Sequence, residues 1–383
     1  MGPTIVLTAA VPWDGTTARP QHFARGLAER GWNVLFVDAP VTWISPFRNR
    51  NLWQHLLPPR PTRDIPVNGS GRLRVLSPVA ILPFGNRRRI VNRWNQRALA
   101  LQIRAAAPGP YILLPMLPGS VDLIPTLQPL AVLYDCVDYH SQFGGLTRVE
   151  TVDAMERELA QLSRTVFTTA DQLQARMEQW HADVRLLPNA AETNHFETTA
   201  TAPVHERLQA FKSPRVGYIG GIGAWIDQDF IVRLADARTD VQFVLIGPVE
   251  TDVSVLKKRP NIHLLGLQPY AELPRFLAGF DAVLVPFRIT DLANAVNPIK
   301  VYEYLAAGRQ VIATPMHEVK KLADLVWIAD NPEAGVAILN RILGGERKGT
   351  DSERQVFLLA NSWSARVDKV DAELRKWVPQ PLT

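Results

Sequence analysis

The amino-acid sequence predicts an α/β protein built from two doubly wound domains, each a mainly parallel sheet covered by helices. Three observations lead to this prediction. The chain has 383 residues, which favours two domains over one. Strand and helix signals alternate along almost the whole sequence, in two consecutive series. The strand segments are continuous apolar runs, which suit parallel strands buried on both faces of a sheet.

The first series begins with a buried strand, TIVLTAA, and an amphipathic helix, RPQHFARGLAERG, that ends at Gly31. Phe23, Leu27 and Ala28 share one face of this helix, so that face is predicted to cover the sheet. A polar stretch, VRLLPNAAETNHFE, leaves the last strand and closes the series. The expected strands are 4–10, 33–40, 72–79, 111–117, 130–138 and 165–170, and the expected helices are 19–31, 86–107 and 151–163.

The second series follows a linker-like segment, TTATAPVHERLQAFKSP, and opens with a strand and a Gly-rich turn in RVGYIGGIG. The further expected strands are 241–249, 262–268, 281–287, 310–315 and 325–330, and the expected helices are 227–238, 271–280, 298–308 and 362–378. The prediction is a first domain at 1–190, completed by the C-terminal helix at 360–383, and a second domain at 191–359. Because ligands bind beyond the carboxyl ends of such strands, the cleft between the domains is the expected site.

The composition is that of a globular protein, with 46% apolar and 21% charged residues. The sequence contains no uninterrupted run of ~18 apolar residues, so no membrane-spanning helix is predicted. The N-terminus lacks the basic region of a signal peptide. The single cysteine, Cys136, excludes a disulfide framework and favours a reducing compartment.

The charge is unevenly distributed along the chain. Residues 1–150 contain 16 Arg, no Lys and eight Asp or Glu, so their net charge is +8 and that of the remainder is −3. This asymmetry favours an anionic partner for the N-terminal half. An arginine-rich genome would explain it equally well.

The segment NPIKVYEYLAAGRQVIATP, residues 297–315, is predicted to form a short helix that runs into a buried strand. Pro298 suits the first helical position, and Gly308 suits the left-handed residue after the last turn. Glu303 is unexpected in a helix that packs on a sheet, and Lys300 lies one turn before it. The residues alone allow either a surface ion pair or a carboxylate placed to bind a ligand.

Several segments resemble one family of enzymes. Residues 297–315 are similar to the donor-sugar signature of GT-B fold glycosyltransferases, particularly the GT4-like bacterial family of teichuronic acid and exopolysaccharide biosynthesis. Further segments that resemble this family are NIHLLGLQPYAELPRFLAGFDAVLVPF, LLPNAAETNHF, ARPQHFARGLAERGWNVLFVDAP and LYDCVDYHSQFGG. The resemblance spans nearly the whole chain, and it implies two Rossmann-like domains facing a cleft and a metal-independent hexosyltransferase.

The resemblance implies an acceptor-binding domain at 1–190 and a donor-binding domain at 191–359. Glu303 would accept hydrogen bonds from the ribose hydroxyls of a nucleotide sugar, with a UDP-sugar expected, and Lys300 would contact a phosphate. Ala295 replaces a second glutamate of the family. Sugar contacts are therefore expected from the backbone around 294–297, which includes Val296 and Asn297, and retention or inversion of configuration stays open.

The Gly-rich turn and a nearby arginine are further candidates for donor binding. Gly221 and Gly223 lie between a strand and a helix, where backbone N–H groups can approach a phosphate, although a tight turn would also need them. Arg288, after the strand at 281–287, would supply a cation. Asp227 and Asp229 begin a helix, so capping explains them, and no metal or other cofactor is expected.

Acidic residues also follow the apolar strand of the first domain. Asp138 and Asp135 are the candidate catalytic residues, with Asp138 preferred and turn capping as the alternative. Such a carboxylate would act as a base in an inverting transfer, or would stabilise an oxocarbenium-like transition state in a retaining one. The candidate acceptor contacts, from the first strand-to-helix turn, are Trp13, Asp14, Arg19 and His22.

The predicted function is transfer of a sugar from a nucleotide diphosphate sugar to a hydroxyl of a lipid-linked or polysaccharide-precursor acceptor. The expected location is the cytoplasm, with peripheral contact to the inner membrane face through the arginines and the interleaved Ile90, Trp94 and Leu101 of the helix at 86–107. An ordinary solvated helix is the alternative there. The alternative functions are a transferase for a soluble acceptor, a nucleotide-sugar epimerase or a non-catalytic sugar-binding scaffold. No nucleic acid partner is expected.

Overall fold

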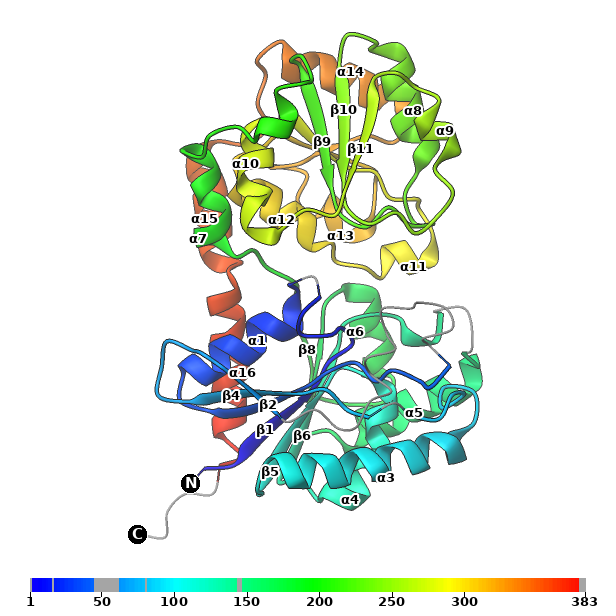
Figure 1. The fold of residues 1–383 in the computed structure, drawn as a ribbon, viewed down its shortest axis with the longest axis vertical. Helices are drawn as coiled ribbons and strands as arrows, with labels where there is room; N and C mark the ends of the chain where they lie inside the picture. The colour runs from blue at the N-terminus through cyan, green and yellow to red at the C-terminus, as the bar shows by residue number, and fades with distance from the viewer. Residues whose placement is uncertain (1, 16, 45–61, 80, 143–146, 379–383) are drawn as a thin grey trace. The chain divides into compact units, whose positions relative to one another are not determined.

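The structure is a computed structural model, and it describes residues 2–15, 17–44, 62–79, 81–142 and 147–378 (Figure 1). The chain divides into two compact units. Unit 1 comprises Met1–Pro188 and Arg366–Thr383, and unit 2 comprises Asn189–Ala365.

Unit 1 is built around an eight-stranded sheet with the order β3-β4-β2-β1-β5-β6-β7-β8. Neighbouring strands are parallel except β3, which runs antiparallel to β4 at one edge. Every residue of β1, β5 and β6 is buried, which is why these segments are unbroken apolar runs in the sequence. The bounds are β1 (Thr4–Thr8), β2 (Asn33–Val37), β3 (Arg63–Ile65), β4 (Arg72–Leu76), β5 (Tyr111–Pro115), β6 (Ala131–Cys136), β7 (Thr165–Thr168) and β8 (Val184–Leu186).

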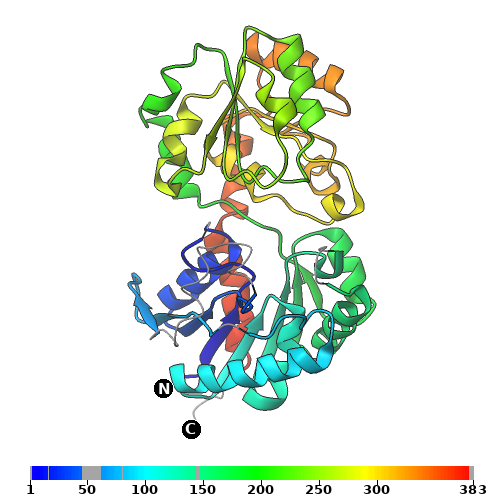
Figure 2. The ribbon, with the colours of Figure 1, turned by 45° about the vertical axis from the view of Figure 1, so that its right-hand side comes forward.

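The C-terminal helix packs against the first helix of unit 1, as Figures 1 and 2 show. A Cβ at Gly26 would lie 2.7 Å from a methyl carbon of Val367, so glycine permits this close packing. Trp32 Nε1 also donates a hydrogen bond to Asp371 at 2.6 Å. The helices of this unit are α1 (Arg19–Glu29), α3 (Arg89–Ala106), α4 (Ile124–Leu127), α5 (Val149–Leu162), α6 (Asp171–Glu178) and α16 (Trp363–Arg375), the last from Arg366 onward.

Unit 2 contains a fully parallel six-stranded sheet with the order β11-β10-β9-β12-β13-β14. The strands are β9 (Arg215–Ile219), β10 (Gln242–Ile246), β11 (Ile262–Gly266), β12 (Ala282–Val285), β13 (Val311–Ala313) and β14 (Trp327–Ile328). The helices are α7 (Thr193–Glu197), α8 (Gln228–Ala237), α9 (Ser254–Lys257), α10 (Leu273–Ala278), α11 (Asp291–Asn294), α12 (Ile299–Ala306), α13 (His317–Lys320), α14 (Pro332–Leu343) and α15 (Asp351–Ala360).

The predicted α/β class with two mainly parallel sheets is confirmed. The short edge strand β3 was not predicted, because its three residues carry no apolar run. The helix expected at 271–280 is shorter, since α10 begins with Pro274 in its first turn, where proline is tolerated. Within the described ranges, no helix combines the length and apolar composition that crossing a bilayer requires.

Candidate functional site

Helix α12 of unit 2 carries the glutamate that the sequence singled out. The helix follows the loop after β12 and ends at Gly308, whose φ of +70° is the left-handed conformation expected there. The Tyr304 hydroxyl accepts a hydrogen bond from the Ile219 amide at 2.7 Å, which ties α12 to the carboxyl end of β9. This hydrogen bond holds α12 next to the Gly-rich turn that follows β9.

Glu303 is buried on α12, and its Oε2 accepts a hydrogen bond from Lys300 Nζ at 2.9 Å. The contacts are compatible with both predictions, an ion pair and a ligand-binding carboxylate. The i, i+3 ion pair with Lys300 forms, but the Glu303 carboxylate is buried, unlike that of a surface pair. Glu303 Oε1 has no hydrogen bond within the described part of the chain, so this oxygen is available to a ligand.

The Gly-rich turn, Trp225 and Arg288 lie together at the carboxyl end of β9. A Cβ at Gly223 would come within 2.3 Å of the Trp225 ring, so the indole packs directly on the turn. The Arg288 amide donates to the Trp225 carbonyl at 2.8 Å, and Arg288 Nε donates to the Ile226 carbonyl at 3.2 Å. A Cβ at Gly221 would lie 3.3 Å from the same ring, and the Gly221 carbonyl accepts a hydrogen bond from the Tyr218 hydroxyl at 2.9 Å.

Asn297 and Val296 precede α12, but the Asn297 side chain is already engaged. Its Oδ1 accepts from the Asn189 amide at 3.0 Å, and its Nδ2 donates to the Tyr302 hydroxyl at 3.1 Å. Asn189 Nδ2 in turn donates to the Asn297 carbonyl at 2.7 Å. These contacts give the Asn297 side chain a structural role. The sugar contact expected from the backbone around 294–297 stays a prediction. Val296 packs partly buried against the core.

A cavity of about 490 Å³ lies in unit 1, at the carboxyl ends of β1, β2, β5 and β6. This is where ligands bind in parallel α/β sheets. Half of the lining residues are apolar, and the polar ones come from the end of β1, from the loops and from α3. The lining residues used below are Asp38, Leu82, Phe84, Asn92, Gln96, Asp138 and His140.

Asp138 is the titratable group of greatest interest in this cavity. It lies two residues after β6, and burial raises the pKa of its carboxyl to about 7. The pKa of the neighbouring His140 is lowered to about 4 by burial, so the imidazole is neutral at neutral pH. A carboxyl group that titrates near neutral pH is suited to act as a general base.

Asp135 has a different environment, although it lies only three residues earlier. It is fully buried, and its two oxygens accept hydrogen bonds from Arg19 Nε at 2.8 Å and Nη2 at 2.7 Å. Arg19 Nη1 also donates to the Leu187 carbonyl at 2.9 Å. Both side chains therefore make buried contacts within unit 1. This geometry argues against Asp135 as a base and against Arg19 as an acceptor contact.

The other predicted acceptor contacts do not line the cavity. Trp13 packs edge-on against Phe36, with 5.0 Å between the ring centroids, and its amide donates to Asp38 at 2.7 Å. Asp14 forms an exposed ion pair with Arg63 at 2.8 Å, and His22 lies half-buried on α1.

Sequence reasoning missed several polar residues of the cavity, among them Asp38 and Gln96. Asp38 follows β2 and accepts a short hydrogen bond from Ser77 Oγ at 2.5 Å. The buried Gln96 Oε1 has no hydrogen-bond partner among the described residues. Asp38 could have been predicted, because the segment VDAP places an acidic residue directly after a buried strand, as the segment VLYDCVD does. No sequence signal showed which face of α3 would be buried.

Asp227 and Asp229 are accounted for without a metal. Asp227 caps α8 by accepting from the Phe230 amide at 3.0 Å, and Asp229 pairs with Arg233 at 3.2 Å.

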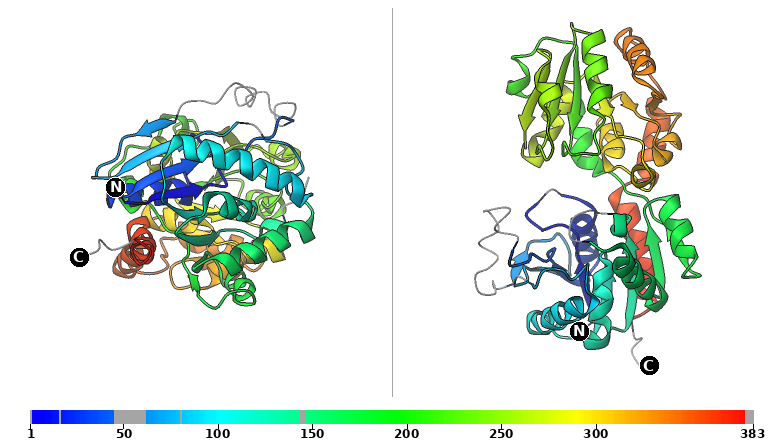
Figure 3. Two further views of the ribbon diagram at one scale, coloured as in Figure 1. Left: turned by 90° about the horizontal axis from the view of Figure 1, so that it is seen from below. Right: turned by 90° about the vertical axis from the view of Figure 1, so that its right-hand side faces the viewer.

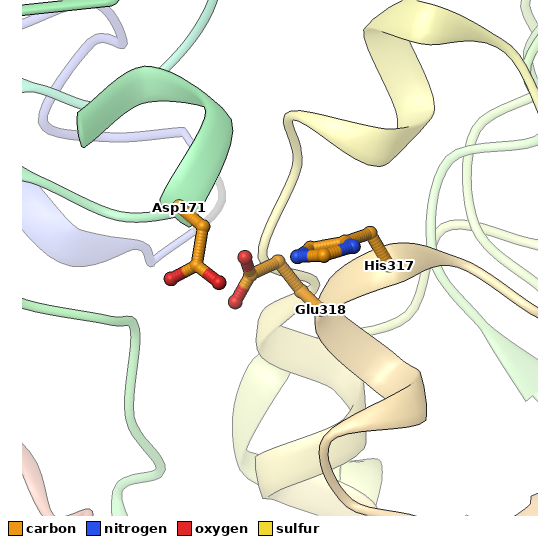
Figure 4. Close-up of side chains that lie close together, drawn as sticks. All are labelled: Asp171, His317 and Glu318. Atoms are coloured by element: carbon orange, nitrogen blue, oxygen red, sulfur yellow. The ribbon is translucent and has the colours of Figure 1, made fainter. Parts of the chain in front are cut away.

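Figure 4 draws three further side chains that offer metal-ligand atoms: Asp171 at the start of α6 in unit 1, and His317 and Glu318 on α13 in unit 2. Both Glu318 oxygens accept from Lys321 Nζ at 2.9 Å. Taken alone, neither unit groups three such side chains in its described part. Metal independence remains a prediction.

Comparison with known proteins agrees with the resemblance stated from the sequence. Residues 213–344 match the family model described as "Glycosyl transferases group 1". This range contains the Gly-rich turn, Arg288 and the whole of α12.

A protein of Bacillus subtilis (strain 168), provisionally named teichuronic acid biosynthesis glycosyltransferase TuaH, is 26% identical to the chain over 253 residues. The match covers 61% of this chain and 64% of that protein, so the chain spans somewhat less than two thirds of this curated relative.

Solved structures resemble the whole chain. A trehalose-6-phosphate protein from E. coli, bound with UDP-2-fluoro glucose, has a TM-score of 0.70 at 11% identity over 98% of this chain and 100% of that one. Sucrose-phosphate synthase from Thermosynechococcus elongatus has a TM-score of 0.66 at 15% identity over 98% of each chain. Anabaena Alr3699/HepE, in complex with UDP and glucose, has a TM-score of 0.60 at 13% identity, also over 98% of each chain. At these identities the likeness shows the fold, which is GT-B.

Proposed function

Because residues 213–344 form a glycosyl transferases group 1 domain in a chain with the GT-B fold, we propose that the protein is a hexosyltransferase. It transfers a sugar from a nucleotide diphosphate sugar, a UDP-sugar being the expected donor, to a hydroxyl group of an acceptor. The observation that carries the proposal is the buried Glu303, which lies on α12 within the matched range and has one oxygen without a hydrogen bond to any residue that the structure describes.

The donor half of the proposal assigns Glu303 to the ribose. A carboxylate can accept hydrogen bonds from two vicinal hydroxyls, and Lys300 holds it in place by its contact with Oε2. The Gly-rich turn and Arg288 would lie along the diphosphate, with Trp225 packed over the turn. Lys300 and Arg288 would stabilise the charge on the departing nucleoside diphosphate, so the proposal needs no metal ion.

The acceptor half assigns the cavity of unit 1 to the substrate that receives the sugar. Asp138 would take the proton from the acceptor hydroxyl while the oxygen attacks the anomeric carbon. The bond from that carbon to the diphosphate oxygen breaks, and the nucleoside diphosphate leaves. If the configuration is retained, the Asp138 carboxylate would instead stabilise the oxocarbenium-like transition state. The unpartnered Gln96 Oε1 supports a hydroxyl-bearing ligand in this cavity.

The proposal extends to the class of acceptor and its location. Leu82 and Phe84 line the cavity and are also exposed at the surface, and this apolar border supports a lipid-linked sugar or a polysaccharide precursor over a small soluble acceptor. We place such an acceptor at the inner face of the cell membrane, with the protein in the cytoplasm and in peripheral contact with the lipid.

Calorimetric titration of UDP, GDP, ADP and dTDP into the full chain tests the donor half. We expect one nucleotide, UDP, to bind selectively, and Glu303→Ala to weaken its binding by about 1.5–3 kcal/mol through loss of a charged hydrogen bond. Glu303→Gln should bind with intermediate affinity, because the amide keeps one acceptor oxygen.

Glu373→Gln is the matched control for this titration. Glu373 is also buried and also pairs with a lysine three residues away, Lys376 at 2.5 Å, but it lies on α16 in unit 1. Its replacement should leave the nucleotide affinity unchanged. If none of the four nucleotides binds, or if both glutamate variants lose the same affinity, the donor assignment is wrong.

A further inference from the structure

Helix α3 of unit 1 has an unusual distribution of side chains. Its buried face is polar in the first half, where Asn92, Asn95 and Gln96 point inward, and becomes aliphatic at Leu99 and Ile103. The inward amides have specific partners: Asn95 exchanges hydrogen bonds with the Leu82 backbone at 2.9 and 3.0 Å. The inner face thus pairs Asn92 and Asn95 with neighbouring loops and turns Gln96 toward the cavity, while apolar residues of α3 lie on the outside.

The outer face of α3 exposes large apolar side chains. Ile90, Trp94 and Leu101 are 51%, 53% and 64% exposed, and their i, i+4, i+11 spacing puts them on one stripe. Leu82 and Phe84, in the loop before α3, are also exposed. The hydrogen bonds between Asn95 and the Leu82 backbone hold this loop beside the helix. In the view from below in Figure 3, α3 lies toward the viewer along unit 1. We call the stripe and the loop the α3 surface.

The α3 surface is also basic. Residues 65–121 contain eight Arg and no Asp, Glu or Lys. Arg89 is neutralised by Asp122 at 2.7 Å and Glu158 at 3.0 Å. In contrast, four exposed arginines have no carboxylate partner in the part of the chain that the structure describes: Arg87, Arg88, Arg97 and Arg104.

We propose that the α3 surface docks on an anionic lipid bilayer, with α3 lying parallel to the membrane plane. A stripe of Trp, Ile and Leu bordered by arginines matches the boundary between acyl chains and anionic headgroups. A protein partner would not require this excess of positive charge, and a nucleic acid would not require exposed Ile and Leu.

The proposal deepens the function proposed above and rests on it only for the path of the acceptor. Leu82 and Phe84 belong both to the α3 surface and to the cavity lining. Docking would thus bring the cavity next to the lipid, and the sugar headgroup of a lipid-linked acceptor could reach Asp138 while its lipid stays in the bilayer. Membrane binding itself is measurable without any transfer reaction.

Sedimentation of the full chain with vesicles tests the proposal. The vesicles contain phosphatidylcholine alone or with about one third phosphatidylglycerol, in about 0.1 M salt. We expect binding to the anionic vesicles only, weakened by added salt. The variant Trp94→Ser/Leu101→Ser should lower the partition coefficient at least tenfold, and Arg88→Gln/Arg97→Gln should lower it by about fivefold for each charge removed.

Val356→Ser/Leu359→Ser is the matched control, because these residues are exposed on another helix, α15 of unit 2. It should bind vesicles as the unmodified chain does. Equal binding to both kinds of vesicle, equal losses in the control, or no loss in the α3 variants would overturn the proposal. Binding of single-stranded RNA that is stronger than vesicle binding and insensitive to Trp94→Ser/Leu101→Ser would also overturn it.

Nucleotide titration of the same variants separates this proposal from the proposed function. The α3 variants should retain the UDP affinity of the unmodified chain, since their substitutions lie in unit 1. Loss of vesicle binding with retained UDP binding supports the α3 surface. Vesicle binding by a chain that binds no nucleotide would leave the α3 surface standing and overturn the donor assignment.

Discussion

The carboxyl ends of the strands carry different chemistry in the two units. In unit 2, Trp225 packs on the Gly-rich turn that follows β9, and Lys300 donates a hydrogen bond to Glu303 on α12. In unit 1, the same edge of the sheet opens into a cavity of about 490 Å³, lined by apolar and polar residues in similar numbers, with the carboxyl group of Asp138, whose pKa is raised to about 7. The first arrangement suits recognition of a fixed polar ligand, and the second suits proton transfer from a ligand to a carboxylate.

The largest expected effect is that of Asp138→Asn on kcat, and it would separate the catalytic step from donor binding. Asp138→Asn keeps the shape of the side chain but removes the base, so kcat should fall by about 10²–10⁴-fold. The UDP affinity should not change, because unit 2 is untouched. Initial rates at saturating donor, together with calorimetry, would measure both. A loss of less than tenfold in kcat would show that unit 1 does not supply the base through Asp138.

The second prediction separates Asp138 from its neighbour. Asp135→Asn leaves the buried Arg19 guanidinium without its countercharge, so the free energy of unfolding should fall by about 3–5 kcal/mol. Urea denaturation would measure this loss. The rate per folded molecule should remain within a few-fold of the original. Normal stability with lost activity would instead make Asp135 the catalytic residue.

The third prediction concerns the Gly-rich turn of unit 2. Gly223→Ala would place a Cβ against the Trp225 ring and should cost about 1–3 kcal/mol of stability, with weaker UDP binding. Adding Trp225→Ala should recover most of the stability, because the clash is then removed. If the two substitutions contribute independently in this double-mutant cycle, the indole is not packed on the turn.

The smallest effect is a difference in pH dependence between the units. A base must be deprotonated, and the pKa of Asp138 is raised to about 7, so kcat/KM should rise about tenfold between pH 6 and 8. The UDP affinity should be nearly constant over that range. A pH-independent rate would remove Asp138 from the mechanism.

The same titration has a consequence for stability. The folded pKa of Asp138 lies above the ordinary value of 3.8, so the folded state holds this proton more tightly than the unfolded chain. Its contribution to stability should be complete below about pH 4 and disappear as the pH rises through 7. Asp138→Asn should flatten this part of the stability profile.

The alternation of elements and the position of α12 were predictable from the sequence, since both are local patterns. The contrast between Asp135 and Asp138 was not. Both acids follow the same apolar run, and the partner that distinguishes them, Arg19, lies 116 residues away. The role of Asn297 was hidden for the same reason, because its partner Asn189 is distant in sequence.

Helix α3 shows a further limit of periodicity. The sequence gives two faces, one with Ile90, Trp94 and Leu101 and one with Asn92, Asn95 and Gln96. The usual rule would bury the first face. The structure buries the second, because loop carbonyls and amides are there to pair with the side-chain amides. Only tertiary contacts could show this.

The short strand β3 has a consequence for aggregation. Without it, β4 would present a free parallel edge to which another chain could add a strand. β3 covers that edge with three residues, of which Arg63 and Asp64 are exposed and charged, and Asp64 pairs with Arg72 at 2.7 Å. A strand this short and charged is a poor template for further pairing. Replacing Arg63 and Asp64 with valine should therefore lower the protein concentration at which the chain begins to self-associate.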